Sequence, residues 1–252
     1  MRNLDSPNPG FRLMIWRELS DVPHSHIEPV TYEVKAVAID LDGTMIHSAP
    51  DLAAAANLTL AQMGAPILSL ETVIGMIGDG IDTLLKRCVK ESLGKELSDD
   101  EMEKYRLIMR AFYAADLFTK SSIYPGVVSS LTKWREKGIE LACITNKASE
   151  LTLPLLEKAQ LGRHFNHTYC ADTPADRKPA PAMIHSFLSD FNVTPDYCVM
   201  IGDSVHDLHA AENAGVAGIG VSYGYGEVDP NGNNLHAIVD NFDMIDFHLA
   251  ST

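Results

Sequence analysis

Two aspartates stand two residues apart in the run Asp-Leu-Asp-Gly-Thr at residues 40–44. The residues before them, 34–39, are mostly apolar and rich in β-branched side chains, which is typical of a strand buried on both faces. Carboxylates serve as nucleophiles, as general acids or bases, or as ligands of hard cations. Because ligands of open α/β sheets bind at the carboxyl ends of strands, Asp40 and Asp42 indicate a site. Taken alone, the run fits an Asp-Gly turn equally well.

Three further polar clusters follow in a fixed order along the chain. They are Thr-Asn-Lys at 145–147, Arg-Lys-Pro at 177–179 and Gly-Asp-Ser-Val-His-Asp at 202–207. Each follows a predicted strand or lies between a strand and the next helix. The carboxyl ends of parallel strands lie at one edge of a sheet, so the four clusters are expected to converge there.

Convergence would bring several carboxylates together with one lysine. The acids are Asp40, Asp42, Asp203 and Asp207, and the lysine is Lys178. Carboxylates at close range repel one another strongly unless a positive charge opposes them. A hard divalent cation bound through oxygen, most simply Mg²⁺, removes this repulsion and also offsets part of the charge on a phosphate.

Each cluster also has a purely structural interpretation. Asp203 or Ser204 could cap the helix that follows, and Thr145 with Asn146 could cap another. Lys178 could be an exposed loop lysine. The occurrence of all four clusters, in order, at one edge of the sheet favours a site over these alternatives.

The predicted elements that would position these residues fall into two groups. From residue 122 onwards strands and helices alternate, which indicates a parallel sheet covered on both faces. Residues 49–121 are instead expected to be helical without a convincing strand, which indicates a second domain inserted after the first strand. The predicted fold is α/β: a Rossmann-like parallel sheet core formed by 34–48 and 122–252, with an inserted α-helical cap domain. The strands expected after the first are 139–145, 167–171, 197–201, 217–221 and 237–240.

The bulk composition limits the class of partner. The chain has 252 residues and a formal net charge of -14, which argues against nucleic acid as a partner. The same charge would repel a phosphate substrate unless a metal or a local positive cluster compensated. No apolar run approaches the roughly 18 residues of a membrane span, so none is predicted. Several prolines interrupt residues 1–33, which are interpreted as an N-terminal extension to which the sequence assigns no function.

The cysteines and histidines indicate no zinc site. His206 and His209 stand three residues apart on a predicted helix and are expected to be surface residues, not ligands. The cysteines are widely spaced, which argues against a zinc site or a disulfide framework and favours a reducing cytoplasm. They are Cys88, Cys143, Cys170 and Cys198.

The four clusters, taken in order, resemble those of the haloacid dehalogenase-like hydrolase superfamily. Within it, the chain looks like the phosphoglycolate phosphatase group that carries a helical cap. The runs Ser-Ala-Pro-Asp-Leu at 48–52 and Tyr-Gly-Tyr-Gly at 223–226 also resemble that group, and the likeness extends from residue 34 to about 247. It implies a Mg²⁺-dependent phosphomonoester hydrolase that acts on a small organic phosphate, with phosphoglycolate as the leading candidate.

The resemblance implies a role for each acid. Asp40 would be the nucleophile that takes the phosphoryl group as an aspartyl-phosphate. Asp42 would protonate the leaving group and then take a proton from the hydrolytic water. That role requires Asp42 to begin protonated, which the charges of Asp40 and Asp203 favour. Mg²⁺ would be bound by Asp40, by the backbone carbonyl of Asp42 and by Asp203.

It also implies how the phosphate would be held. Gly43, Thr145 and Asn146 would bind the phosphate oxygens of the substrate, and Lys178 would neutralise charge in the transition state. Asp207, one helical turn after Asp203, would orient Lys178 or a water on the metal.

Two positions depart from the pattern of the family. His47 stands where the family often has Asp, near the hinge to the cap, so cap closure is expected to differ. Asp79, between two glycines, falls where the specificity loop of the family lies, and an acid there disfavours an anionic substrate. Lys86 and Arg87 are the nearest cations of the cap and are not expected to contact substrate.

Two rival functions remain at this stage. A sugar-phosphate mutase of the β-phosphoglucomutase type shares the paired aspartates and the cap, although 145–147 favours the phosphatase. A dehalogenase or a phosphonate hydrolase would have no use for Asp42. A non-catalytic phospho-accepting or metal-sensing module is the rival of another class, but such modules are shorter and have no cap. The expected partner is a small phosphate ester, and the expected assembly a monomer or homodimer.

Overall fold

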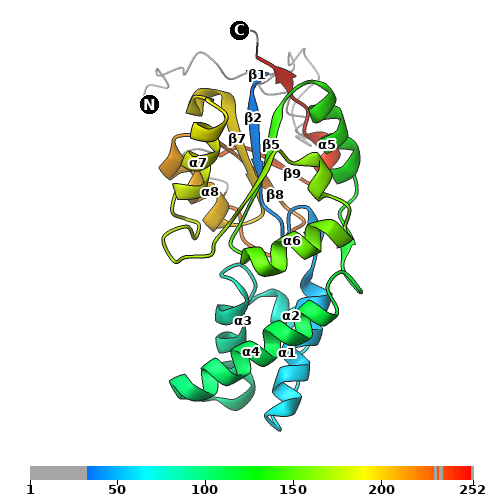
Figure 1. Cartoon of the computed structure of the whole chain (residues 1–252), viewed down its shortest axis with the longest axis vertical. Coiled ribbons are helices and arrows are strands. Elements are labelled where there is room, and N and C mark those ends of the chain that lie inside the picture. Colours follow the sequence, from blue (N-terminus) through cyan, green and yellow to red (C-terminus); the bar gives the residue numbers. More distant parts are fainter. Residues whose placement is uncertain (1–32, 230–231, 233–234, 251–252) are drawn as a thin grey trace, which may run out of the picture.

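The computed structural model describes residues 33–229, 232 and 235–250, and it consists of an α/β core with a group of helices at one end (Figure 1). The predicted extension lies outside the described residues, apart from Glu33. The core contains a six-stranded parallel sheet in the order β6-β5-β2-β7-β8-β9. Its strands are β2 (Ala36–Ile39), β5 (Glu140–Thr145), β6 (His167–Cys170), β7 (Cys198–Gly202), β8 (Ala217–Val221) and β9 (Leu235–Val239).

The strand order reverses direction at β2. From β2 the chain passes to β5 and β6 on one side, and it then returns to β7, β8 and β9 on the other. A parallel sheet has a crevice at such a switch point, because the loops after the two flanking strands diverge. The loops after β2, β5 and β7 therefore surround the place where a ligand would bind.

The strands are buried on both faces, as the apolar run before Asp40 predicts. Ala36 and Ala38 of β2 belong to one hydrophobic cluster, and Val37 and Ile39 belong to the other. This alternation follows from the two-residue period of a strand. Helices α7 (Ala182–Asp190) and α8 (Val205–Ala214) cover the alanine face, whereas α5 (Val127–Glu136) and α6 (Ser149–Lys158) cover the other. Figure 1 shows the two pairs on opposite sides of the sheet.

The helical group is formed by four consecutive helices at the carboxyl edge of the sheet (Figure 1). They are α1 (Ala49–Gln62), α2 (Leu70–Ile74), α3 (Ile81–Leu93) and α4 (Asp99–Ala115). The chain enters this group after β3 (Ile46–His47) and leaves it through β4 (Ser122–Ile123), and these two short strands pair antiparallel. The entry and exit therefore lie side by side, as an insertion into a loop requires.

Asp51, in the first turn of α1, binds residues 119–121, through which the chain leaves the helical group. Its buried carboxylate accepts backbone N–H bonds from Thr119 at 3.1 Å, Lys120 at 2.8 Å and Ser121 at 3.0 Å. A buried carboxylate needs such donors, because it has lost its hydration. Local sequence signals set other helix ends: Ser98 and Glu101 form the capping box that starts α4.

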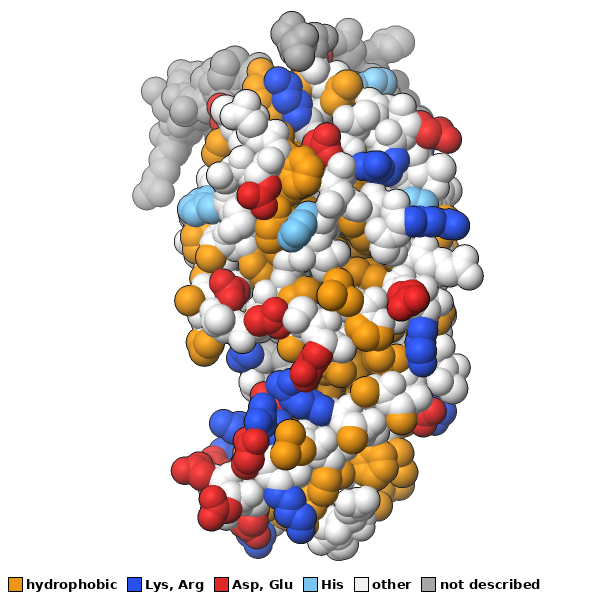
Figure 2. Space-filling model, viewed as in Figure 1, with side chains coloured by type: hydrophobic (Ala, Val, Ile, Leu, Met, Phe, Trp, Pro, Cys, Tyr) orange, Lys and Arg blue, Asp and Glu red, His pale blue; other side chains and the backbone are white. Residues whose placement is uncertain are grey.

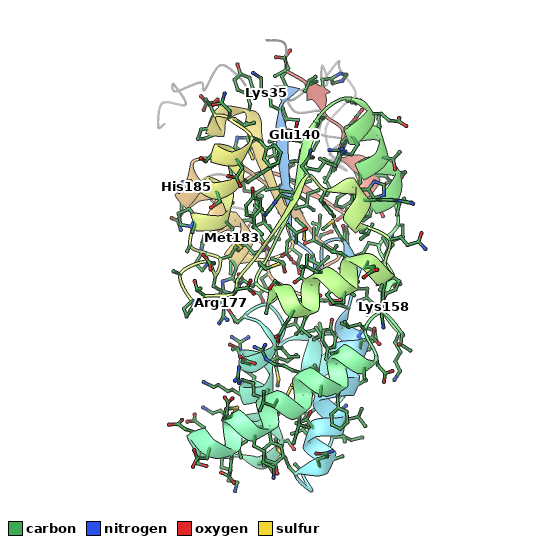
Figure 3. All side chains as sticks on the ribbon, viewed as in Figure 1. Lys35, Glu140, Lys158, Arg177, Met183 and His185 are labelled. Atoms are coloured by element: carbon green, nitrogen blue, oxygen red, sulfur yellow. The ribbon has the colours of Figure 1, made fainter. Side chains whose placement is uncertain are left out.

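The two ends of the described chain meet at the opposite edge of the core. β1 (Glu33–Val34) pairs with β10 (His248–Leu249) in parallel. Figure 3 shows Lys35 and Glu140 near this edge, whereas Arg177 and Lys158 lie near the cap. Lys158 donates to the carbonyl of Leu117 at 3.1 Å, which adds a contact between α6 and the cap exit.

The fold class and the parallel sheet are as the sequence predicts, whereas the short strands β3, β4 and β10 were not predicted. The strand expected from residue 34 is divided at Lys35, because β1 pairs with β10 while β2 pairs with β5 and β7. Short 3₁₀ turns complete the core: η1 (Gly162–His164), η2 (Pro195–Tyr197) and η3 (Phe242–Met244). Among the described residues, no helix is long and apolar enough to cross a membrane.

Candidate active site

Asp40 lies directly after β2 and forms a buried ion pair with Lys178. Lys178 Nζ lies 2.5 Å from Asp40 Oδ1 and 2.6 Å from Asp207 Oδ1, and it donates to the carbonyl of Ile144 at 2.8 Å. Lys178 is 3% exposed and Asp40 is 7% exposed. The interpretation of Lys178 as an exposed loop lysine is therefore wrong, because its ammonium group is enclosed between two carboxylates and a carbonyl.

The acids outnumber the lysine, and the pKa values reflect this. Burial raises the pKa of Asp40 well above its usual range; Lys178 opposes this only in part, and Asp207 and Asp203 add to it. Burial, with a further contribution from Asp207, raises the pKa of Asp203 to about 6. Burial lowers the pKa of Lys178, but Asp207 and Asp40 outweigh this and leave it above its usual value. The site holds a surplus of negative charge.

Asp203 follows β7, and protein donors hold both of its oxygens. Tyr225 N at 2.7 Å and Gly226 N at 3.1 Å donate to Oδ2, and the hydroxyl of Thr44 donates to Oδ1 at 3.2 Å. Gly43 passes so close that a Cβ there would lie 2.4 Å from Asp203 Oδ2, and its φ of +91° also disfavours a side chain. The Asp-Gly-Thr run thus has Gly43 where the backbone must approach Asp203.

One carboxyl oxygen from each of Asp40, Asp203 and Asp207 can be chosen so that all lie within 4.8 Å of one another. The three residues are buried, and Lys178 is the ammonium group between them. Hard oxygen donors with excess negative charge suit Mg²⁺, so the residues present fit the predicted metal. The carboxylate of Asp42 is not part of this cluster, and only its backbone carbonyl is predicted to bind the ion.

Asp207 lies in the first turn of α8 and belongs to the cluster of three carboxylates. Its Oδ2 accepts from the backbone N–H of Ser204 at 3.1 Å and from the hydroxyl of Ser204 at 2.7 Å, while its Oδ1 contacts Lys178. Ser204 does cap α8, as the structural interpretation held, and Asp207 completes the capping box. The same bonds hold Asp207 beside Lys178, and its role in orienting Lys178 stays a prediction.

Asp42 is paired with a lysine that the sequence analysis did not single out. Lys147 Nζ lies 2.9 Å and 3.2 Å from the two oxygens of Asp42, and 4.6 Å from the centroid of the Tyr113 ring on α4. Burial lowers the pKa of Lys147, but Asp42 and Tyr113 outweigh this and leave it above its usual value. The Thr-Asn-Lys run contained the signal, because its lysine follows a strand end.

Thr145 is the last residue of β5 and Asn146 follows it, and neither is the helix cap, since Ala148 is the N-cap of α6. The hydroxyl of Thr145 accepts from Lys147 N at 3.2 Å. Asn146 Oδ1 accepts from Lys178 N at 2.7 Å, and its Nδ2 lies 3.2 Å from Lys178 O and 3.1 Å from Gly78 O. The amide of Asn146 thus anchors the Lys178 loop, and its contact with a phosphate stays a prediction.

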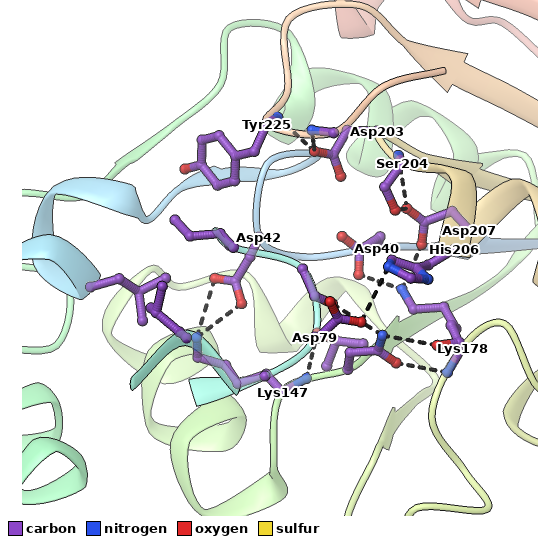
Figure 4. A pocket seen from close by; sticks show the side chains of 18 of the residues that line it. Asp40, Asp42, Asp79, Lys147, Lys178, Asp203, Ser204, His206, Asp207 and Tyr225 are labelled. Carbon is purple, nitrogen blue, oxygen red and sulfur yellow. Dashed lines mark hydrogen bonds and ion pairs between the residues drawn. The ribbon is translucent and has the colours of Figure 1, made fainter. Parts of the chain in front are cut away.

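A cavity of about 430 Å³ contains these residues and reaches into the cap. The cap contributes the loop of residues 75–80, here called the cap loop, and part of α3. Figure 4 shows Asp79 of the cap loop directed towards His206 of α8. Arg87, which was not expected at the substrate, also lines the cavity.

The two histidines of α8 differ in position. His206 lines the cavity and lies 3.2 Å from Asp79, so the expectation that it is a plain surface residue is wrong. His209 is exposed, as expected. The three-residue spacing of the histidines could not reveal this, because the opposing surface comes from the cap.

His47 lies at the hinge, in β3. Its Nδ1 lies 3.0 Å from the hydroxyl of Tyr225, and that hydroxyl also accepts from Ala49 N at 2.9 Å at the start of α1. Tyr225 also donates its backbone N–H to Asp203, so this one residue contacts both the carboxylate cluster and the hinge. No role was predicted for Tyr225 beyond its place in the run 223–226, which resembles that of the family.

The chain matches a family model described as haloacid dehalogenase-like hydrolase over residues 37–221. A phosphoglycolate phosphatase of Nitrosospira multiformis is 39% identical over 77% of this chain and 86% of that protein. One from Pseudomonas savastanoi is 39% identical over 81% of this chain and 75% of that protein. The crystal structure of a predicted phosphoglycolate phosphatase from Haemophilus somnus has a TM-score of 0.78 and 31% identity, covering 83% of this chain and 95% of that one. This protein belongs to the haloacid dehalogenase-like hydrolase family.

Proposed function

We propose that this protein is a Mg²⁺-dependent phosphatase that hydrolyses a small organic phosphomonoester through an aspartyl-phosphate. The observation that carries the proposal is the position of Asp40 at the switch point of the sheet, where it contacts Lys178 and forms a cluster of buried carboxylates with Asp203 and Asp207. The family and the named relatives support phosphatase chemistry.

Asp40 is the nucleophile in this proposal. A carboxyl oxygen of Asp40 forms a bond to phosphorus as the ester P–O bond breaks, and the leaving alkoxide takes a proton from Asp42. Water then attacks the phosphorus, Asp42 accepts a proton from that water, and the Asp40 carboxylate and free phosphate are released. Since Lys147 contacts both oxygens of Asp42, the carboxyl group must turn from Lys147 towards the leaving oxygen.

In this proposal the remaining residues offset negative charge and hold the phosphate, the metal ion and Lys178 in position. Lys178 offsets negative charge beside Asp40, and Gly43, Thr145 and Asn146 bind the phosphate oxygens. Asp40, Asp203 and the backbone carbonyl of Asp42 would hold Mg²⁺, which when bound supplies positive charge against the carboxylates and the phosphate. Asp207 keeps Lys178 in place.

The cap is proposed to close over the site and exclude bulk water. It comprises residues 49–121, and the core comprises 34–48 and 122–252. Phosphoglycolate is the proposed substrate, because the two relatives described above carry that substrate in their names. We also propose a cytoplasmic location, in keeping with the four free thiols, and a monomer or homodimer.

The test is phosphate release from a panel of small phosphomonoesters, measured with Mg²⁺ and with a chelator. Wild-type protein is expected to release phosphate only with Mg²⁺ and fastest from phosphoglycolate. Asp40→Asn, which keeps the shape of the side chain, is expected to lose release by at least about 10³-fold, because an amide is no nucleophile.

Two other results of this experiment would contradict the proposal, each in a different way. Retained turnover in Asp40→Asn would remove Asp40 from its role. Stable phosphate labelling of Asp40 in the wild-type protein, with no release from any ester, would instead favour a mutase or a phospho-accepting module.

A further inference from the structure

The cap loop and the start of α8 face each other across the cavity. Asp79 Oδ1 lies 3.2 Å from His206 Nε2, and Gly78 O accepts from Asn146 Nδ2 at 3.1 Å. Figure 4 shows the side chains of Asp79 and His206 directed towards one another. The cap loop therefore rests on two core residues that lie within motif clusters.

Arg87 of α3 also binds the cap loop, from within the cap. It donates to the carbonyl of Met76 at 2.8 Å and to Asp79 Oδ2 at 2.5 Å. One carboxyl oxygen of Asp79 thus accepts from Arg87 within the cap, and the other lies next to His206 of the core. Asp79 is the residue through which the braced loop reaches α8.

Several other charged residues of the cap form ion pairs away from this contact. Figure 2 shows lysine and arginine side chains gathered with acids on the cap. Arg106 and Arg110 both pair with Asp82, and Arg110 also contacts Glu150 of α6. Asp79 and His206 form a separate contact at the cavity itself.

Both core residues beneath the loop are tied to the Lys178 segment. Asn146 binds the backbone N–H and carbonyl of Lys178, and His206 directly precedes Asp207, which contacts Lys178 Nζ. The position of the loop is therefore linked to the groups that hold Lys178 beside Asp40. A substrate between the cap loop and Asp40 would be enclosed by this contact.

We propose that His206 is a positioning residue whose contact with Asp79 holds the cap loop closed over the cavity. Its effect on turnover rests on the proposed phosphatase function, whereas its effect on the loop does not. His206 acts through the loop and not on the phosphate. Closure of such loops excludes water and completes the binding site.

The kinetic test uses phosphoglycolate and Mg²⁺. His206→Ala is expected to raise KM about fivefold, the effect of losing one hydrogen bond, with kcat changed less than about twofold, because saturating substrate still closes the loop. His206→Gln keeps an N–H donor and is expected to restore KM to within about twofold. His209→Ala, an exposed histidine on the same helix, is the matched control and is expected to leave KM unchanged.

A double-mutant cycle tests the partner. Asp79→Ala and His206→Ala remove the same contact, so their effects on KM should not multiply in the double variant. The rise in KM of the double variant is expected to be about fivefold smaller than the product of the two single rises. Effects that simply multiply, or a His206→Ala variant that behaves like His209→Ala, would overturn the proposal.

Amide hydrogen exchange gives a readout that needs no activity. His206→Ala is expected to speed exchange in the cap loop while the amides of α8 keep the wild-type rate, and His209→Ala is expected to do neither. Faster loop exchange in a protein that hydrolyses no ester would leave the loop contact standing and reject the phosphatase. Hydrolysis by the wild type, with unchanged loop exchange in His206→Ala, would reject the contact alone.

Discussion

At the scale of single residues, the site contains two lysine–carboxylate pairs with different surroundings. Lys178 is enclosed by Asp40 and Asp207, deep in the core. Lys147 contacts Asp42 and lies against the ring of Tyr113 from the cap. The proposed nucleophile, Asp40, thus forms its ion pair with a core residue, whereas the proposed acid and base, Asp42, lies where the cap can influence it.

The role of Asp42 predicts a dependence on the leaving group. Asp42→Asn is expected to slow hydrolysis of an alkyl phosphate by about 10² to 10⁴-fold, since the alkoxide then has no proton donor. An aryl phosphate with an acidic leaving group needs no such proton, so Asp40 would still be phosphorylated. Rapid-quench analysis should then detect accumulated phosphoenzyme, because water activation also needs Asp42. Equal losses for both esters, with no phosphoenzyme, would contradict the assignment.

At the scale of elements, α5 is held to the C-terminal segment by packing and by charge. The Trp134 ring packs against Phe242 and Phe247 at centroid distances of 5.5 Å and 5.0 Å. Lys133 of α5 and Lys137, the residue that caps its C-terminal end, both lie 2.7 Å from carboxyl oxygens of Asp246. These contacts bring the last described strand next to β1.

This pair of contacts predicts a pH-dependent stability. Partial burial raises the pKa of Asp246, but Lys133, Lys137 and the Phe247 N–H outweigh it, so the pKa lies below its usual value. A carboxylate with a lowered pKa stabilises the fold above its unfolded value of about 3.9, and it loses this contribution as the pH falls through the folded value.

Asp246→Asn is therefore expected to lower the free energy of unfolding by about 0.5 to 1 kcal/mol at pH 7, because the pair is partly exposed. The difference should stay constant from pH 7 down to about pH 4 and shrink only below that, as the pH falls through the lowered pKa of Asp246. Urea unfolding at several pH values measures it, with Glu136→Gln on the exposed face of the same helix as control. A difference that stays constant below about pH 4 as well would show that charge is not the cause.

At the scale of the whole molecule, a protein of net charge -14 places buried carboxylates at the meeting point of core and cap. One hydrophobic cluster continues from a face of the sheet into the cap, so the two parts are packed together and not merely linked. The surplus of acid at the site lowers stability unless a cation binds.

Mg²⁺ is therefore expected to stabilise the folded protein. At ten times its dissociation constant it should add about 1.4 kcal/mol, which for a chain of this size raises Tm by about 3 to 6 °C. Calorimetry with Mg²⁺ and with a chelator, at equal ionic strength, measures the shift. Asp203→Asn should abolish the shift, and an undiminished shift in that variant would place the ion elsewhere.

The sequence by itself determined the fold class and the convergence of Asp40, Thr145 and Asp203. Periodicity identifies strands and helices, and the carboxyl ends of parallel strands must meet at one edge.

Only the tertiary structure decided which side chains face one another across the cavity. The contacts of Lys147 with Tyr113 and of His206 with Asp79 each join residues of the core to residues of the cap. Neither is encoded in local spacing, since each depends on how the inserted helices dock on the sheet. Docking is determined by the summed packing of two surfaces, and no single motif records it.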